Sequence, residues 1–277
     1  MKPAPFEYRR PGSLAEAVAL LADQSRIVKP LAGGQSLVPM LNLRLAPIDL
    51  AVDISRLSEL RGISLERQIL RLGACVTHAE IEDAEPLSAS MRLLRAVAGG
   101  IANRAIRNRG TVGGSVALAD PATEWPSTLL ALDAVAHLRG PAGVRSVPLG
   151  EFFLGAYTTT LGQDELLEAI TLPARSASFK AGFEKICRKA GEFASSLAFV
   201  AIDPSAGYAR VVLGGTGGAP LVLERVGALA RTGSATDAAT VRAAAQEDFA
   251  ASGRQFDDYE RQIHSVSVAR ALKKAIA

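Results

Sequence analysis

Two short glycine clusters contain the residues whose types and spacing are best suited to chemistry. They are Ala32-Gly33-Gly34-Gln35-Ser36 and Thr111-Val112-Gly113-Gly114-Ser115. Glycine lets a backbone turn tightly and approach a ligand closely. Successive N–H groups in such a turn form a concave nest for an anion. Two nests on one chain suit a ligand with two phosphates, such as a dinucleotide.

The clusters differ from the best-known phosphate motifs. Neither matches the G-x-G-x-x-G pattern of dinucleotide-binding folds or the G-x-x-x-x-G-K-[ST] pattern of nucleotide-binding loops. A single Gly-Gly pair is more often just a turn, and we interpret a third cluster, Gly214–Gly218, as a loop or hairpin. The order and spacing of the first two clusters therefore carry the argument.

Side chains for acid–base, nucleophilic or metal chemistry are scarce. The three histidines, His78, His137 and His264, show no metal-ligand spacing, and we expect structural or surface roles for them. The two cysteines, Cys75 and Cys187, lie in strand-like runs and are expected to be buried thiols; without a C-x-x-C pair this chain cannot hold a zinc ion or an iron–sulfur cluster through four thiolates. We therefore predict no catalytic side chain and no metal site, which fits a flavin that performs the chemistry itself.

Composition narrows the possible partners. The chain has 277 residues, 48% hydrophobic and 21% charged, as in an ordinary globular protein. A net charge of +3 does not favour nucleic acid, which needs a clustered basic face. The densest basic run, Arg104 to Arg109, is expected to flank a phosphate site or to be solvated. No secretory signal and no membrane-spanning run is evident, so we predict a cytoplasmic protein without a membrane span.

The first glycine cluster should follow a strand and precede a helix. Ser13 to Glu16 reads as a capping box, and it predicts a helix over 14–23. Strands are predicted over 27–31 and 50–54, with a second helix that starts near Ser36 and ends before Pro47. This βαβ-like order places the first nest at a helix N-terminus, where the N–H groups and the helix dipole both favour an anion.

The rest of the chain mixes strands and helices. Strands are predicted over 69–73, 129–138, 166–172, 179–187 and 208–213, a short apolar run over 116–119, and a turn over 203–207. A capping box at Thr77 to Glu80 and helices over 87–97, 237–252 and 259–276 are also predicted. The last third reads as a separate α+β domain that begins near Pro173.

Longer motifs around both clusters resemble the FAD-binding medium subunit of the molybdenum hydroxylases, the family that contains xanthine dehydrogenase and carbon monoxide dehydrogenase. Leu31–Met40, led by Lys29 and Pro30, looks like the first FAD loop of this family. Asn108–Ala117 and Ala119–Pro126 look like its second loop, and the 151–155, 165–167 and 183–193 segments match later blocks. The two loops lie about 80 residues apart, and the resemblance covers nearly the whole chain.

The resemblance implies an α+β fold in three parts. Two subdomains of the vanillyl-oxidase or PCMH type, over residues 1–56 and 57–172, would hold FAD between them. A C-terminal α+β domain over residues 173–277, with an antiparallel sheet and helices, would close over the flavin. FAD should be non-covalent, because the histidine that carries covalent flavin in related oxidases is not evident near the first loop.

The resemblance also implies a set of cofactor-binding residues. The two loops would cradle the diphosphate, Glu124 would lie against the cofactor, and Leu167 would be an apolar neighbour. Ile101 stands where some members place an aromatic ring beside the flavin, and Lys185 and Phe193 are carried over from the third domain. The full predicted set is Lys29, Pro30, Leu31, Ala32, Gly33, Gly34, Gln35, Ser36, Leu37, Ile101, Thr111, Val112, Gly113, Gly114, Ser115, Ala117, Glu124, Leu167, Lys185 and Phe193.

By resemblance, the chain would be an electron-transfer subunit in a dimer of heterotrimers. A large subunit would carry molybdopterin, a small subunit would carry two [2Fe–2S] clusters, and FAD on this chain would pass electrons to an external acceptor. Purines, N-heterocyclic aromatics, aldehydes and carbon monoxide are all possible substrates, because the substrate pocket would lie on another chain. Two alternatives stay open: a stand-alone FAD oxidase of the same fold, and a non-catalytic nucleotide-binding assembly protein.

Overall fold

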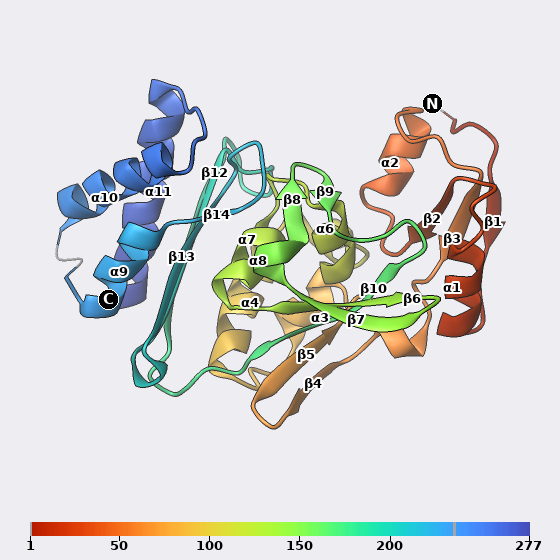
Figure 1. Ribbon diagram of the computed structural model, residues 1–277, viewed down its shortest axis with the longest axis horizontal. Coiled ribbons are helices and arrows are strands. Elements are labelled where there is room, and N and C mark those ends of the chain that lie inside the picture. Colours follow the sequence, from red (N-terminus) through yellow and green to blue (C-terminus); the bar gives the residue numbers. More distant parts are fainter. Residues whose placement is uncertain (1, 235–236) are drawn as a thin grey trace.

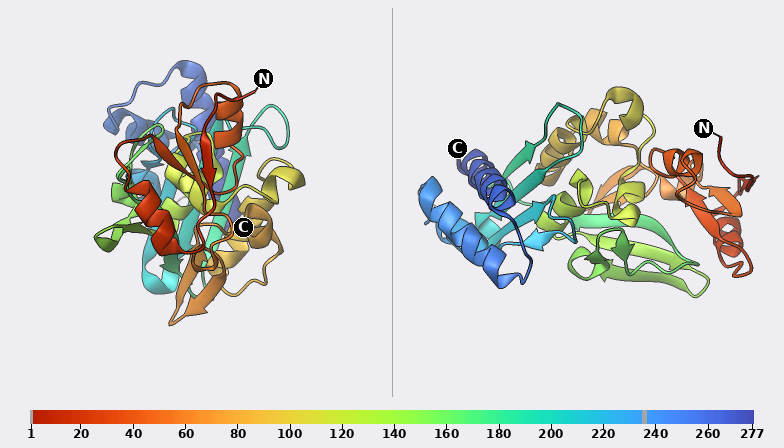
Figure 2. Two further views of the ribbon diagram at one scale, coloured as in Figure 1. Left: turned by 90° about the vertical axis from the view of Figure 1, so that its right-hand side faces the viewer. Right: turned by 90° about the horizontal axis from the view of Figure 1, so that it is seen from above.

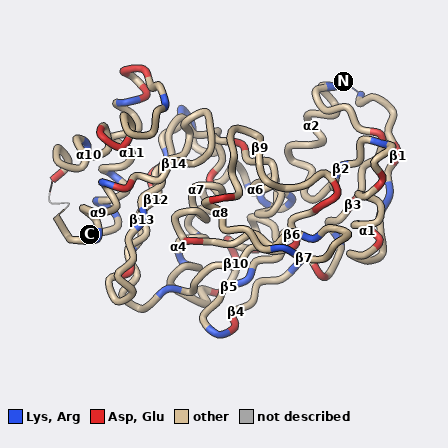
Figure 3. Tube along the Cα trace, viewed as in Figure 1, with Lys and Arg blue, Asp and Glu red and all other residues tan. Residues whose placement is uncertain are grey.

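Three larger sheets, each with its own helices, follow one another along the longest axis of the molecule (Figure 1). The structure is a computed structural model that describes residues 2–234 and 237–277. The N-terminus lies at one end of the molecule and the C-terminal helices at the other, which the view from above also shows (Figure 2). Basic and acidic residues are interspersed over all three parts (Figure 3).

The first part is a small parallel sheet with two helices. The strands β1 (Glu7–Arg9), β2 (Val28–Leu31) and β3 (Leu50–Asp53) run parallel in the order β1-β3-β2. Helix α1 (Leu14–Leu21) follows β1, and helix α2 (Leu37–Asn42) follows β2. The Ser13 side chain accepts the Glu16 N–H, as predicted, but the Glu16 carboxylate reaches back to the N–H of Gly12 instead of Ser13. Because β2 and β3 run parallel, their carboxyl ends meet at one edge of the sheet.

The second part is an antiparallel sheet covered by short helices. Its strands lie in the order β4 (Ile63–Glu66), β5 (Ile69–Gly73), β10 (Leu166–Pro173), β6 (Val135–Gly140) and β7 (Gly143–Pro148). A 3₁₀ turn, η1 (Ser58–Leu60), leads into it, and β8 (Phe153–Gly155) pairs with β9 (Thr158–Thr159) beside it. The helices are α3 (His78–Asp83), α4 (Ala89–Gly99), α5 (Arg104–Arg107), α6 (Val112–Leu118), α7 (Glu124–Ala131) and α8 (Leu149–Phe152).

The third part is an antiparallel sheet between two layers of helices. Strands β11 (Lys180–Ile186), β12 (Ser196–Asp203), β13 (Tyr208–Gly214) and β14 (Leu221–Val222) lie in sequence order, with the turn η2 (Pro204–Ala206) between β12 and β13. Helices α9 (Glu224–Thr232), α10 (Ala238–Ala251) and α11 (Asp258–Ile276) lie on one side of the sheet (Figure 1). Helix α7 packs against β12 and β13 and so joins this part to the second.

Most of the predicted elements are present, and one predicted strand needs correction. The predicted strand over 129–138 is wrong in its first half, because helix α7 continues to Ala131 and the strand β6 begins only at Val135. A short apolar run does not distinguish a buried strand from a buried helix, and Pro126 stands in the first turn of α7, where proline is tolerated. The apolar run over 116–119 belongs to helix α6 and its C-cap.

Strand β12 and helix α9 were not predicted. All eight residues of β12 are buried, since helices cover both faces of its sheet, and such a strand shows no alternation of polar and apolar residues. The predicted turn over 203–207 coincides with η2 and its C-cap residue, Gly207. The Gly214–Gly218 cluster connects β13 to the antiparallel strand β14, as predicted.

Candidate functional site

The fold brings the first glycine loop into contact with Arg109 and Gly110, the two residues that lead into the second loop. The first loop, residues 32–36, connects β2 to α2, and the second, residues 111–115, forms the start of α6. A β-carbon at Gly33 would lie 2.1 Å from the carbonyl oxygen of Arg109, so only glycine allows this approach. Two segments about 80 residues apart in the chain are thus held together at the boundary between the first two parts of the fold.

The first loop presents free hydrogen-bond donors. Within residues 2–234 and 237–277, no hydrogen-bond acceptor is found for the N–H groups of Gly33, Gly34, Gln35 or Ser36. Gly34 has a φ of +73°, a left-handed conformation that glycine adopts without strain. The loop ends at the N-terminus of α2. Consecutive free N–H groups of this kind are suited to binding the oxygens of a phosphate.

The second loop uses its N–H groups within the protein. Val112 donates to the carbonyl of Val76, and Gly113 donates to the carbonyl of Ala74. The N–H of Gly114 donates to Thr111 Oγ1 at 3.1 Å. Gly114 is exposed, and a β-carbon there would meet only Thr111 Oγ1 within 4 Å. The second loop therefore contributes a rigid surface without side chains, while the first loop contributes the donors.

Glu124 and Lys185 form a buried ion pair. Glu124 is the first residue of α7 and Lys185 lies on β11, and their Oε1 and Nζ atoms are 2.6 Å apart. Burial raises the pKa of the Glu124 carboxyl above its usual value, although Lys185 opposes the rise. Lys185 Nζ also lies 3.5 Å from the carbonyl of Gly100, next to Ile101. The pair thus joins the third part of the fold to the segment that leads to the second glycine loop.

The remaining predicted site residues are divided between core and surface. Ile101 and Leu167 are buried in one hydrophobic core with Val112. Phe193 is 69% exposed, on the segment between β11 and β12. The others lie on or beside the two loops: Lys29 is exposed on β2, Pro30, Leu31, Ala32, Leu37, Ser115 and Ala117 are partly buried, Gln35 and Ser36 are exposed, and Thr111 and Gly113 are buried.

The buried His78 contacts the residue before the second loop, Gly110, and its hydrogen-bond partner Trp125 was not predicted from the sequence. Trp125 Nε1 donates to His78 Nδ1 at 3.0 Å, and burial lowers the pKa of His78 to about 4, so the ring is neutral near pH 7. The backbone N–H of His78 donates to the carbonyl of Gly110. Because the Thr77–Glu80 capping box is formed in both directions, the position of His78 at the start of α3 is fixed. The capping box was the only sequence signal for this arrangement.

The other two histidines contact serine and threonine hydroxyls, and neither cysteine forms a disulfide. His137 lies between Thr171 and Ser146 on the second sheet, and His264 Nδ1 lies 2.8 Å from Ser196 Oγ in a buried cluster. Both cysteines are free thiols; Cys75 is buried, whereas Cys187 is only partly buried, which corrects the expectation for it. Among the residues that the structure describes, no group of three or more His, Cys, Asp or Glu could hold a metal ion.

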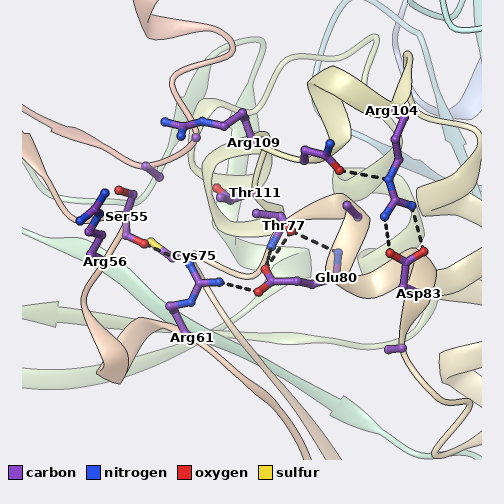
Figure 4. A pocket seen from close by; sticks show the side chains of 15 residues that line it. Ser55, Arg56, Arg61, Cys75, Thr77, Glu80, Asp83, Arg104, Arg109 and Thr111 are labelled. Atoms are coloured by element: carbon purple, nitrogen blue, oxygen red, sulfur yellow. Dashed lines mark hydrogen bonds and ion pairs between the residues drawn. The ribbon is translucent and has the colours of Figure 1, made fainter.

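Two arginines of the basic run line a cleft, and one of these two forms no ion pair among the described residues. Arg104 pairs with Glu82 and Asp83, and Arg107 pairs with Glu82. Arg104 and Arg109 both line a cleft of about 620 Å³, together with Gly33 and Thr111 (Figure 4). Of the two, Arg109 forms no ion pair among the described residues. Sequence reasoning placed this run beside a phosphate site but did not identify the cleft.

Comparisons with known proteins agree with one another. Residues 4–175 match the family described as "FAD binding domain in molybdopterin dehydrogenase". The carbon monoxide dehydrogenase medium chain of Hydrogenophaga pseudoflava is 37% identical over 286 aligned positions, which cover 100% of this chain and 99% of that one. The caffeine dehydrogenase subunit beta of Pseudomonas sp. is 39% identical over 80% of this chain and 76% of its own length.

Solved structures show the same fold. Carbon monoxide dehydrogenase from H. pseudoflava matches with a TM-score of 0.90 and 34% identity, over 100% of this chain and 99% of that one. Quinoline 2-oxidoreductase from Pseudomonas putida 86 matches with a TM-score of 0.86 and 30% identity, over the full length of both chains. The α+β fold class expected from the sequence is thereby confirmed. None of the helices in the described residues is long and apolar enough to cross a membrane.

Proposed function

Because the chain belongs to the family of FAD-binding domains of molybdopterin dehydrogenases, we propose that it is the electron-transfer subunit of a molybdenum hydroxylase complex. The chain is an oxidoreductase subunit that binds FAD. In our proposal it receives electrons from the [2Fe–2S] clusters of a small partner subunit and passes them to an external acceptor. A large partner subunit carries molybdopterin and oxidises the substrate, and the whole forms a dimer of heterotrimers in the cytoplasm.

One observation supports the proposed role most directly. The first loop carries free N–H groups and packs through Gly33 against Arg109, which leads into the second loop, and the exposed Gly114 of the second loop has no side chain to exclude a ligand. A diphosphate needs this combination of donors and close approach. When bound, FAD would exchange both single electrons and electron pairs with its redox partners. The residues of this chain would bind and orient it.

We assign each group a role in holding the cofactor. Residues 33–36 would donate to the diphosphate, and residues 113–115 would form the surface that it lies against. The Glu124–Lys185 pair and Ile101 would line the side towards the third part of the fold. The neutral His78 ring, fixed by Trp125, would hold the second loop in position without adding charge. The boundaries that we propose are 1–56, 57–172 and 173–277, and they are supported by the three larger sheets, although β10 extends to Pro173.

A reoxidation experiment on the purified complex tests the proposal. The complex is reduced with dithionite, and reoxidation of its [2Fe–2S] absorbance is followed with NAD⁺, a quinone or oxygen. We expect rapid reoxidation with at least one acceptor, loss of that rate after FAD is removed, and recovery when FAD is added back. Equal rates with and without FAD would mean that electrons leave elsewhere. Purification of this chain alone as an active oxidase would favour the stand-alone alternative.

A further inference from the structure

The third glycine cluster, Gly214–Gly218, presents more free donors than a simple connection between two strands needs. It joins β13 to β14, and its start is fixed, because the N–H of Gly215 donates to the carbonyl of Pro121 at 2.9 Å. Beyond that point, within residues 2–234 and 237–277, no acceptor is found for the backbone N–H groups of residues 216–218. Three consecutive backbone donors are therefore free.

The conformation of this loop suits an anion. Gly215 and Gly217 have φ values of +76° and +68°, left-handed conformations that glycine adopts without strain. Turns of this kind bring successive N–H groups together in a concave nest. A β-carbon at Gly217 would meet no atom within 4 Å, so this position of the loop is open to a ligand.

Arg254 places a guanidinium group against the same loop. It lies on the connection between α10 and α11, and its Cζ is 3.6 Å from where a β-carbon of Gly218 would stand. Its Nη1 donates to Thr216 Oγ1 at 2.6 Å. In the described part of the chain this is the one acceptor found for its side chain, and a guanidinium group has five N–H donors. Four donors are therefore left for a ligand.

Local hydrogen bonds hold Arg254 in this position. Its backbone N–H donates to Ser252 Oγ, and that hydroxyl donates in turn to the carbonyl of Phe249. Phe256, two residues further along the chain, is buried beside the Phe249 ring. The connection is thus tied to the core on both sides of Arg254, and a ligand would meet a preorganised cation.

The charge of Arg254 has no partner among the described residues. Its side chain is partly buried, and no ion pair joins it to a carboxylate there. Burial lowers the pKa of the guanidinium group, and no neighbouring carboxylate opposes the shift. Arginine is seldom buried without a partner, because desolvation of a charge is costly unless an opposite charge compensates it. A bound anion would supply that compensation.

We propose that Arg254 and the backbone donors of residues 216–218 bind a phosphate group, either free phosphate or a phosphate monoester. Phosphate oxygens accept charge-assisted hydrogen bonds from guanidinium groups and from the N–H groups of a nest. None of these residues belongs to the set assigned to FAD. The α10–α11 connection lies at the C-terminal end of the molecule, and the first glycine loop lies towards the opposite end (Figure 1). The third part of the fold would thus bind a ligand of its own.

Isothermal titration of the FAD-loaded chain with inorganic phosphate, glycerol 3-phosphate and acetate tests this proposal. We expect saturable phosphate binding, weakened about tenfold by Arg254→Gln, as for loss of a hydrogen bond to a charged group. Thr216→Val removes the hydroxyl that orients Arg254 and should weaken binding by a smaller factor. Arg242→Gln is the matched control, because Arg242 is exposed on α10 without an ion pair among the described residues. Tighter binding of glycerol 3-phosphate than of phosphate would identify a monoester, and equal or weaker binding would identify free phosphate; both support the site.

Four results would overturn the proposal. The first is the absence of saturable phosphate binding, and the second is acetate binding as tight as that of phosphate, since the loop would then select charge alone. The third is equal phosphate affinity of the Arg254→Gln and Arg242→Gln variants. The fourth is a loss of FAD affinity in Arg254→Gln, which would place Arg254 in the FAD site. Urea unfolding checks that each variant folds; if Arg254→Gln does not, equal phosphate affinity of Thr216→Val and Arg242→Gln contradicts the site.

Discussion

Replacing Lys185 with methionine should expose the cost of burying Glu124 without its partner. The side chains of the pair are 10% and 6% exposed, and 2.6 Å separates Nζ from Oε1. Removing one member of a buried ion pair typically destabilises a protein by about 3–5 kcal/mol, because the remaining charge is desolvated without compensation. We expect a loss in this range for Lys185→Met at pH 8. Lys180→Met, at an exposed position of the same strand, should change stability by less than about 0.5 kcal/mol.

The loss should depend on pH in a direction that follows from the pKa of Glu124. Burial already raises this pKa above 4.5, and removal of Lys185 raises it further. A group whose pKa is higher in the folded state contributes stability that is fully present below its unfolded pKa and is lost as the pH rises through the folded value. The Lys185→Met variant should therefore be closest to the wild type below pH 4.5 and furthest from it at pH 8.

Urea unfolding followed by tryptophan fluorescence measures this effect. Trp125 is the only tryptophan, is fully buried, and adjoins Glu124. In the double variant Glu124→Gln/Lys185→Met no charge is buried, so we expect it to recover much of the loss. An equal loss at pH 4 and pH 8, or a Lys185→Met variant as stable as Lys180→Met, would refute the reasoning.

Three more predictions concern Gly33, Trp125 and the two cysteines. Gly33→Ala should lower the free energy of unfolding by about 1–3 kcal/mol, since its β-carbon would lie 2.1 Å from a backbone oxygen; an unchanged urea midpoint would contradict the loop contact. Trp125→Phe should cost about 1–3 kcal/mol by leaving the buried His78 Nδ1 without a donor, and thermal unfolding measures it. Thiol titration of the folded chain should modify Cys187 well before Cys75, whose pKa burial raises to about 12; equal rates would argue against that burial.

Local sequence signals predicted the elements that depend on local chemistry. The capping box at Thr77 places the start of α3, and strand β5 has the predicted bounds Ile69–Gly73. The two glycine loops were recognised because a tight turn before a helix needs glycine. Their contact through Gly33 and Arg109 is a tertiary feature, and the family resemblance was needed to predict that they form one site.

The features that were missed depend on which parts of the chain meet. The last three residues of helix α7, 129–131, were predicted as part of a strand because the apolar residues of α7 are buried on all sides, between the second core and the third sheet. Strand β12 has no polar face for the same reason. Lys185 and Glu124 were each predicted to contact the cofactor, but their mutual pairing could not be read from positions 61 residues apart. The cleft arginines come from two segments about 45 residues apart, 56–61 and 104–109, so no local motif marks them.

The affinity of the chain for FAD, with a single methyl group added to the second loop, tests the central claim most directly. Gly114→Ala adds a β-carbon on an exposed surface, 2.8 Å from Thr111 Oγ1, so that hydroxyl must shift to make room, and Gly227→Ala adds the same group within helix α9. If the diphosphate lies against this surface, fluorescence titration should show FAD binding weakened about tenfold or more for Gly114→Ala, about 1.4 kcal/mol, and unchanged for Gly227→Ala. Equal affinity of both variants for FAD would contradict the placement of the cofactor on the two glycine loops.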